Sequence, residues 1–268
     1  MNSLAPVLFL PHGGGPMPLL GDPAHESLIQ FLKTRAAHYE RPEAIVLVSA
    51  HWEATVPGVT ADPHPSLLFD YYGFPPETYR YGYPAPGQPQ LAHEISMLLG
   101  KGGFECQLVT DRGYDHGMFV PMMLLYPEAD IPCIQLSLIK GLDAAQHIRL
   151  GECFTSLRAK NIMIIGSGMS FHNLQALFAA DQPHRAASDQ FDKWLVQTLS
   201  DKTLSRAERQ QALEHWDAAP HARFCHPREE HLLPLHVCFG AAKGNAPAEV
   251  IFNEALMGHK VAGFAWQQ

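Results

Sequence analysis

Short apolar runs alternate along the chain with longer segments in which apolar residues recur every three or four positions. The runs cover residues 6–11, 44–50, 105–110, 133–138 and 162–168, and their β-branched and aliphatic content predicts strands. Helical periodicity occurs in residues 25–39, 90–103, 143–160 and 189–199. Strands that alternate with helices predict an α/β fold, in which helices flank a mostly parallel central sheet.

Two segments depart from this alternation. Residues 248–266 contain two strand-like runs around Met257 and Gly258, which predicts an antiparallel C-terminal hairpin at the edge of the sheet. Residues 62–90 are too aromatic for a disordered linker and too rich in proline for a helix. We expect them to form an ordered excursion near a pocket, with a self-packed surface loop as the alternative. We expect residues 1–268 to form a single domain.

Composition and charge exclude several classes of protein. The formal net charge of -8 argues against nucleic acid or anionic lipid as the main partner. The five cysteines show no C-x-x-C spacing, so neither a disulfide framework nor a zinc knuckle is expected. No apolar stretch approaches the ~18 residues of a membrane span, and the N-terminus does not resemble a signal peptide. We therefore expect a cytoplasmic protein.

Histidine is abundant, with 16 residues against 19 Lys and Arg, and several histidines follow predicted strands. His12 and His51 end the first and second strands, and His172 lies just beyond the strand at 162–168. In an open parallel sheet, ligands bind outside the carboxyl ends of the strands. Each histidine alone could be a hydrogen-bonded core residue, but a shared destination favours a functional site.

Two further clusters add potential ligands. The sequence "YDHGMFVP" places Asp115 beside His116, and "CHPREEHLLPLH" contains His226, Glu229, Glu230, His231 and His236. A metal site needs three or four nitrogen or oxygen ligands brought together from separated positions. His12, His51 and one of Glu229, Glu230 or His231 would supply them.

Other residues receive simpler interpretations. Pro16 and Pro18 prevent the glycines after His12 from continuing into a phosphate-binding helix. Ser167 lies between two glycines, which favours a tight turn over a nucleophile. Five histidines lie in polar or helical surface contexts, and we expect them to be solvated: His25, His38, His93, His147 and His184.

The motifs "PHGGGP", "SAHW", "YDHGMFVPMMLLYPEADIP", "GSGMSFHNL" and "HPREEHLLPLH", in this order, resemble the class III extradiol ring-cleaving dioxygenases. Within them the chain is most similar to the branch of DOPA 4,5-extradiol dioxygenases. The resemblance runs from His12 to about Gly240. It implies an α/β catalytic domain and an Fe(II)-dependent cleavage of a catechol by O₂ to a muconic semialdehyde.

The resemblance also implies roles for individual residues. His12, His51 and His231 match metal ligands, His172 matches the catalytic acid/base, and His116 matches a histidine that faces the substrate. Glu230 stays open as the third ligand instead of His231, because better-known class III enzymes use two histidines and a glutamate. Three imidazoles would also suit Zn(II), which has no redox chemistry with which to activate O₂. We expect further substrate contacts from Tyr71, Tyr72, Phe74, Tyr79, Asp115 and His226, and we expect Asp115 or a backbone carbonyl to hold His116.

Two other functions fit parts of this pattern. A zinc-dependent hydrolase could use the same histidines, with His172 activating a water molecule, and it would turn over without O₂. A non-catalytic peptide-binding module like the Memo-type proteins would also use a histidine-lined pocket. The sequence does not specify which catechol is the substrate, and it is compatible with a monomer or a homo-oligomer.

Overall fold

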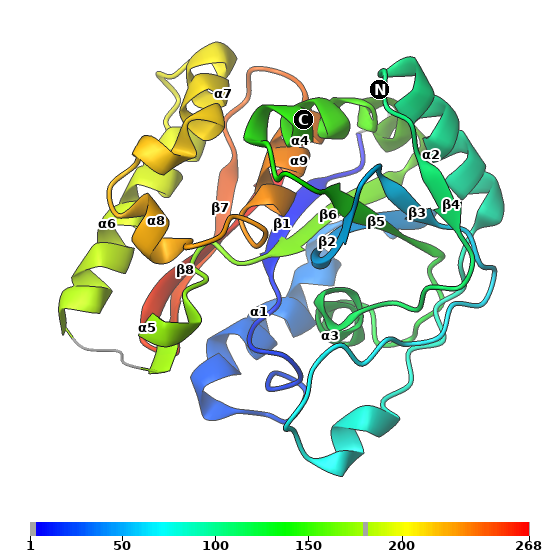
Figure 1. Ribbon diagram of the computed structural model, residues 1–268, viewed down its shortest axis with the longest axis horizontal. Coiled ribbons are helices and arrows are strands. Elements are labelled where there is room, and N and C mark those ends of the chain that lie inside the picture. Colours follow the sequence, from blue (N-terminus) through cyan, green and yellow to red (C-terminus); the bar gives the residue numbers. More distant parts are fainter. Residues whose placement is uncertain (1–3, 179–181, 268) are drawn as a thin grey trace.

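The computed structural model of the protein describes residues 4–178 and 182–267 (Figure 1). Its strands are β1 (Val7–Pro11), β2 (Ala44–Ala54), β3 (Gly58–Thr60), β4 (Gln107–Val109), β5 (Cys133–Ile139), β6 (Ile162–Gly168), β7 (Glu249–Leu256) and β8 (His259–Trp266). Its helices are α1 (Glu26–Arg35), α2 (Pro89–Lys101), α3 (His116–Leu125), α4 (Ala144–Glu152), α5 (Leu174–Phe178), α6 (Gln182–Ser200), α7 (Arg206–Glu214), α8 (Ala222–Cys225) and α9 (Leu233–Ala242).

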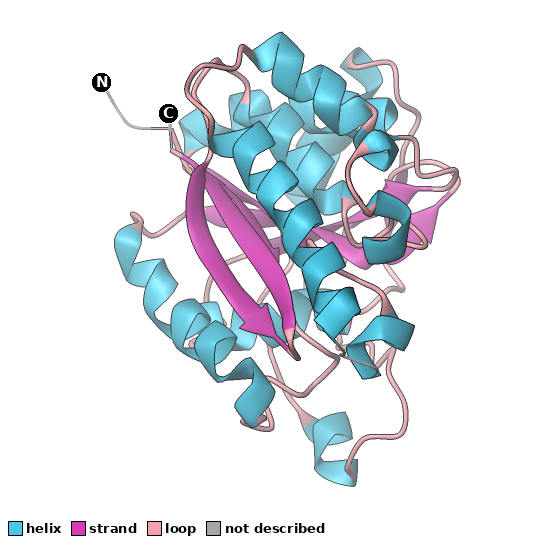
Figure 2. Ribbon diagram, turned by 90° about the vertical axis from the view of Figure 1, so that its left-hand side faces the viewer, coloured by secondary structure: helices cyan, strands magenta, loops and turns pink. Residues whose placement is uncertain are grey.

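The strands form one sheet in the order β4-β3-β5-β2-β6-β1-β8-β7. The central strands β5, β2, β6 and β1 are parallel. β8 pairs antiparallel with β1, and β7 pairs antiparallel with β8 at the edge of the sheet, on the side that faces the viewer in Figure 2. These pairings confirm the predicted fold class and the C-terminal hairpin. The short strand β3, which pairs antiparallel with β5, was not predicted.

Helices cover both faces of the sheet, as the packing around β6 illustrates. A Cβ atom on Gly166 would lie 2.5 Å from the carbonyl oxygen of Pro234, so glycine lets α9 approach this face closely. The next residue, Ser167, bonds instead to the carbonyl of Gly117 in α3. Because successive residues of a strand point to opposite faces, α9 and α3 lie on opposite sides of the sheet. α4 packs on α9, and α1 packs on α3.

The segment between β3 and α2 is ordered, as expected. Leu67 forms a bridge with Tyr114, and the backbone N–H of Leu68 donates to the Tyr114 carbonyl at 2.7 Å. A short 3₁₀ helix follows at Pro76–Arg80. This segment therefore lies next to the start of α3. Among the described residues, no helix combines the length and the apolar character needed to cross a membrane. All five cysteines are free thiols.

Candidate active site

His12 directly follows β1, at the edge of the sheet where the parallel strands end. Its backbone N–H donates to the carbonyl of Gly168 at 3.3 Å, which joins the ends of β1 and β6. The imidazole is 1% exposed, and its Nδ1 lies 3.0 Å from Oγ of Ser167. Because the Ser167 hydroxyl donates to the carbonyl of Gly117, it accepts from Nδ1–H of His12. Nε2 of His12 is therefore the unprotonated nitrogen, whose lone pair can bind a cation.

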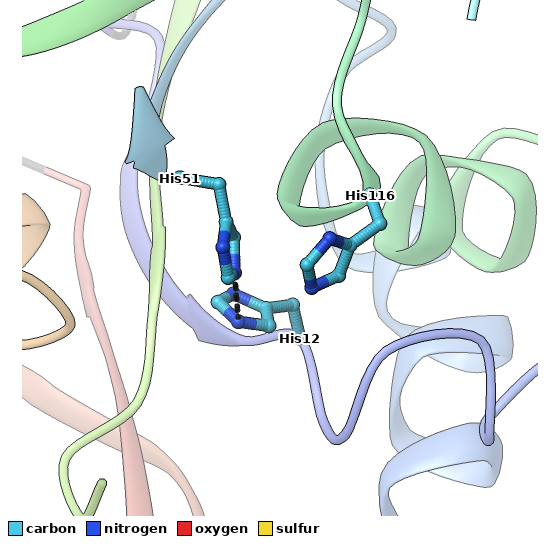
Figure 3. A group of neighbouring side chains, drawn as sticks. All are labelled: His12, His51 and His116. Carbon is cyan, nitrogen blue, oxygen red and sulfur yellow. Dashed lines mark hydrogen bonds between the residues drawn. The ribbon is translucent and has the colours of Figure 1, made fainter. Parts of the chain in front are cut away.

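His51 lies inside β2, which continues to Ala54, whereas the predicted strand covered residues 44–50 and ended at His51. The register of β2 against β5 shifts between Val48 and Glu53, and His51 is within this irregular part. Register irregularities bend a strand and redirect its side chains, and they are frequent next to active sites. Here the imidazole points toward His12, and the two Nε2 atoms are 3.1 Å apart (Figure 3).

His116 is the first residue of α3, and Asp70 holds it. The backbone N–H and Nδ1–H of His116 both donate to Oδ1 of Asp70, at 3.0 Å and 2.7 Å. The ring centroid of His116 is 3.8 Å from that of His51 and 5.7 Å from that of His12, and Figure 3 shows the three rings converging. A bond that fixes Nδ1 as the protonated nitrogen leaves Nε2 as the acceptor.

His231 and His172 form a stacked pair next to His12 and His51. Their ring centroids are 3.4 Å apart and their planes differ by 14°. Oε1 of Glu230 lies 2.9 Å from Nδ1 of His231 and 3.3 Å from Nδ1 of His172. The ring of His231 is also within 5.3 Å of His12 and 4.8 Å of His51, measured between centroids. The predicted site histidines His12, His51, His116, His172 and His231 are thus brought together.

The cluster contains two separate sets of potential metal ligands. His12, His51 and His116 have ligand atoms within 4.8 Å of one another, and so do His172, Glu230 and His231. Each set contains one histidine whose Nδ1 is bonded to a carboxylate. These are His116 in the first set and His231 in the second. A carboxylate behind a histidine is the usual arrangement around protein-bound metals, since it fixes the ring and raises its basicity. The donor set fits a metal that accepts imidazole nitrogen.

Burial keeps the imidazoles at the centre neutral. Loss of solvation lowers the pKa of His12 and of His231 well below the ordinary value, and the neighbouring histidines lower each further. Burial together with His116 lowers the pKa of His51 to about 3, although Asp70 acts in the opposite direction. Neutral imidazole is the form that binds metal, so these groups are ready as ligands at neutral pH.

The aromatic segment lies beside this cluster through Tyr71. The Tyr71 ring is perpendicular to that of His116 at 5.8 Å, and it also contacts Phe74 and Tyr79 at 5.5 Å and 5.3 Å. Tyr72, in contrast, is 91% exposed. A side chain so exposed cannot form part of a pocket wall here, so the expected contact between Tyr72 and a substrate is not supported.

Solvent reaches the cluster on the side of His172. An open cavity of about 290 Å³ is lined by His172, Asn173, Leu174, Gln175, Pro227, Arg228 and Glu230. His172 is 21% exposed as a side chain, whereas the His231 side chain behind it is 6% exposed. The stacked pair thus presents one imidazole to the cavity and the other to the buried histidines.

Comparison with known proteins agrees with this geometry. Residues 6–265 match the family described as the catalytic LigB subunit of aromatic ring-opening dioxygenase. The chain belongs to this family. The dioxygenase tasH of Hapsidospora irregularis is 43% identical over 89% of this chain and 78% of its own length. The 4,5-DOPA dioxygenase extradiol of Beta vulgaris is 38% identical over 80% of this chain and 78% of its own. That of Escherichia coli K12 is 34% identical over 94% and 91%.

A solved structure has the same fold as this chain. The crystal structure of an uncharacterized Escherichia coli K12 protein superposes with a TM-score of 0.77 at 29% identity, over 97% of this chain and 99% of that one. With the family and these relatives, the chain is an extradiol aromatic ring-opening dioxygenase. Dioxygenases of this family depend on a metal, and the histidine cluster supplies nitrogen donors for one.

Two residues expected to bind substrate in this LigB-family dioxygenase are instead buried. Asp115 is fully buried; its carboxylate accepts bonds from Ser49 at 2.7 Å and Arg112 at 3.0 Å, and it also bonds Gln135. Burial raises its pKa, and the charge of Asp70 adds to this. A carboxyl group with all these protein partners is not available to a substrate. The expectation that Asp115 or a carbonyl holds His116 was wrong, because Asp70 does so.

His226 is likewise fully buried, and its Nε2 bonds to the carbonyl of Ser170 at 2.9 Å. Its ring packs against Phe191 and Trp216, and burial lowers its pKa to about 3. These contacts are those of a core histidine and argue against direct contact with a substrate.

Sequence reasoning missed Asp70 and misread Ser167. Asp70 is a charged residue within "LLFDYYGF", an aromatic stretch where a carboxylate needs a partner, and that contrast was the available signal. Ser167 lies in β6 and bonds His12, so it is a positioning residue and not part of a turn. His25 and His147, expected to be solvated, are both fully buried.

Proposed function

We propose that this dioxygenase cleaves the ring of a catechol that carries a DOPA-like side chain, with Fe(II) held by His12, His51 and His231. Relatives named 4,5-DOPA dioxygenase extradiol support this substrate class. The observation that carries the proposal is the convergence of the buried imidazoles of His12, His51 and His231, from the end of β1, from β2 and from the segment before α9. Fe(II) held there would supply binding of the catechol oxygens and the redox chemistry that O₂ requires.

His231 is favoured over Glu230 as the third ligand. Oε1 of Glu230 is engaged by Nδ1 of His231 and of His172, and its other oxygen is 3.4 Å from Arg228. The glutamate therefore stands behind the histidine as its orienting group, as carboxylates commonly do around metals. This arrangement supports His231 as the ligand and Glu230 as the residue that holds it.

His172 is the acid/base in this proposal. A catechol must lose a proton to bind through its oxygens, and a partly exposed histidine at the cavity can accept it. Glu230 stabilises the imidazolium that forms. His172 then returns the proton as the ring opens. Both oxygen atoms of O₂ are incorporated into the product, a semialdehyde that also carries a carboxylic acid. His116, whose Nδ1–H is held by Asp70, turns Nε2 toward the substrate and accepts a hydrogen bond from a catechol hydroxyl there. Tyr71 and Phe74 form the wall for the ring.

The experiment is oxygen uptake by protein stripped of metal and reloaded anaerobically with Fe(II), given a panel of catechols that includes DOPA. We expect stoichiometric uptake and a yellow semialdehyde product. The His172→Ala variant serves as the matched control, and it should keep its iron and lose turnover. Absence of uptake by verified iron-loaded protein, or turnover of an ester panel by the zinc form without O₂, would overturn the proposal.

Metal content assigns the third ligand. His231→Ala should lose Fe(II), whereas His116→Ala should retain it and turn over slowly. Because the ligand atoms of His116, His12 and His51 also lie within 4.8 Å of one another, the reverse result would place His116 in the ligand set instead.

A further inference from the structure

Arg228 forms an unusually complete ion pair at the mouth of the cavity. Its Nη1 and Nη2 atoms lie 2.5 Å and 2.6 Å from the two carboxylate oxygens of Glu53, a bidentate arrangement. Glu53 follows His51 by two residues in β2, so Arg228 joins the segment before α9 to the strand that carries His51.

The same guanidinium also reaches Glu230. Nη1 of Arg228 is 3.4 Å from Oε2 of Glu230, while Oε1 of that carboxylate contacts the Nδ1 atoms of His231 and His172. One oxygen therefore serves two stacked imidazoles, and the other faces the cation. The Glu230 side chain is 13% exposed, whereas that of Arg228 is 55% exposed.

The contact between Oε2 and Arg228 matters because a carboxylate that is held through only one oxygen can rotate. If the Glu230 carboxylate rotated, Oε1 would lose its contact with one of the two imidazoles, or Oε2 would take the place of Oε1 in that contact. A cation fixed against Oε2 opposes that rotation and favours simultaneous contact with both rings. Glu53 in turn fixes the cation, since a bidentate pair defines the plane of the guanidinium.

We propose that Arg228 is a positioning residue for ring cleavage, which acts through Glu230 on His172 and His231 and is itself held in place by Glu53. This inference rests on the proposed roles of His172 as acid/base and His231 as ligand. Arg228 lines the cavity but has no part in binding the substrate. Its contribution lies in kcat and in metal affinity, and KM is independent of it.

The first test is Arg228→Met, which keeps the aliphatic stem and removes the charge. We expect kcat to fall about tenfold or more, as is typical when groups behind metal ligands are removed, with KM for DOPA and for unsubstituted catechol unchanged. Arg223→Met is the matched control. Arg223 is 50% exposed and pairs with Glu229 at 2.6 Å, next to Glu230 in sequence, and it should behave as wild type.

Exchanging the charges of Glu53 and Arg228 tests whether Arg228 positions Glu230 or only attaches the segment before α9 to β2. The double variant Glu53→Arg with Arg228→Glu restores an ion pair between the two positions but places a carboxylate beside Glu230. We expect it to recover the melting temperature lost in either single variant and not to recover kcat. Recovery of both would show that Arg228 only fastens the segment, and would overturn the proposal.

Metal affinity provides a readout that does not need turnover. Co²⁺ binding is measured by visible absorption in competition with a chelator. Arg228→Met should bind Co²⁺ about tenfold more weakly than wild type and show an altered spectrum, whereas Arg223→Met should match wild type. Unchanged Co²⁺ binding together with unchanged kcat would refute the proposal. A rise of KM for DOPA but not for catechol would also refute it, by making Arg228 a substrate-binding residue. If wild type consumed no O₂, the proposed function would fail while Co²⁺ binding still tested the role of Arg228.

Discussion

Asp70 and His116 are joined twice through a single oxygen atom. Oδ1 of Asp70 accepts the backbone N–H of His116 at 3.0 Å and its Nδ1–H at 2.7 Å. The first bond fixes the start of α3 and the second fixes the ring, so the position of the imidazole is set from both ends. Burial alone would raise the pKa of Asp70, but the hydrogen bonds and charge of His116 outweigh it and leave the pKa lowered. Asp70 is therefore a carboxylate at neutral pH.

Asp70→Asn should slow ring cleavage without loss of the metal. The amide is neutral and holds Nδ1–H less strongly, so His116 becomes less well ordered, and we expect kcat to fall about 10- to 100-fold. Asp62→Asn is the control, because Asp62 accepts a backbone N–H from His64 in the same segment but contacts no site histidine. Steady-state oxygen uptake and iron analysis of both variants provide the measurement. Equal rates in Asp70→Asn and wild type would show that His116 needs no orienting carboxylate.

Neighbouring tyrosines of the aromatic segment should differ sharply in their effects. Tyr71 contacts His116 and is 8% exposed, whereas Tyr72 is 91% exposed. Tyr71→Leu keeps apolar bulk but removes the aromatic face, and we expect KM for the catechol to rise several-fold because an aromatic pair contributes about 0.5–1.5 kcal/mol. Tyr72→Leu should leave KM unchanged. An effect of Tyr72→Leu as large as that of Tyr71→Leu would place the substrate outside the cluster.

The central strands could be predicted because each contains a mostly apolar run rich in aliphatic residues. β1, β2, β5 and β6 are buried on both faces, and such strands show in a sequence without any alternation. The rule that ligands lie at the carboxyl ends of parallel strands then brought His12, His51 and His172 together. In contrast, α3 is apolar on all sides and contains Pro121, so it has no helical periodicity to detect.

The missing parts of the site depend on contacts between distant positions. Asp70 is 46 residues from His116, and Ser167 is 155 residues from His12, so no local pattern reveals either bond. The burial of His25 depends on contacts that are closer in sequence. Its Nε2 accepts the N–H of Gly14 and its Nδ1 bonds Asp22, which places it beneath the glycines after His12 instead of in solvent.

Gly13 should tolerate alanine much less well than Gly21. Both have positive φ angles, +79° and +70°, so alanine at either pays a similar backbone cost of about 1–2 kcal/mol. Only at Gly13 would the new Cβ meet other atoms, with Cγ of Pro18 at 2.7 Å and Cδ2 of His25 at 2.8 Å. We therefore expect Gly13→Ala to be less stable than Gly21→Ala by roughly 1–3 kcal/mol, the usual cost of overpacking. Urea unfolding measures this difference, and equal stabilities would mean that the turn after His12 relaxes freely.

His147 should make the apo-protein sensitive to mild acid. The histidine is fully buried, its Nε2 accepts the N–H of Ile139 at 3.0 Å, and its Nδ1 bonds the carbonyl of Asp143 at 2.7 Å. Burial lowers its pKa to about 4 in the folded protein, despite the opposing bond to Asp143. Protonation of Nε2 would also break the bond to Ile139. The unfolded chain, in which a histidine has a pKa near 6.5, binds this proton more readily.

The sign of the effect follows from that difference. Above about pH 6.5 neither state is protonated at His147, and its contribution to stability is complete. Between about pH 6.5 and 4 the unfolded state binds more protons, so stability falls as the pH falls, by up to about 1.4 kcal/mol per pH unit. Other buried histidines add to the total, which makes the comparison with a variant necessary. Metal-free wild type should lose about 2 kcal/mol more than His147→Gln between pH 7 and pH 5. The exposed His93→Gln should parallel wild type. If His147→Gln and wild type lost the same stability between pH 7 and pH 5, protonation of His147 would not be a cause of the acid sensitivity.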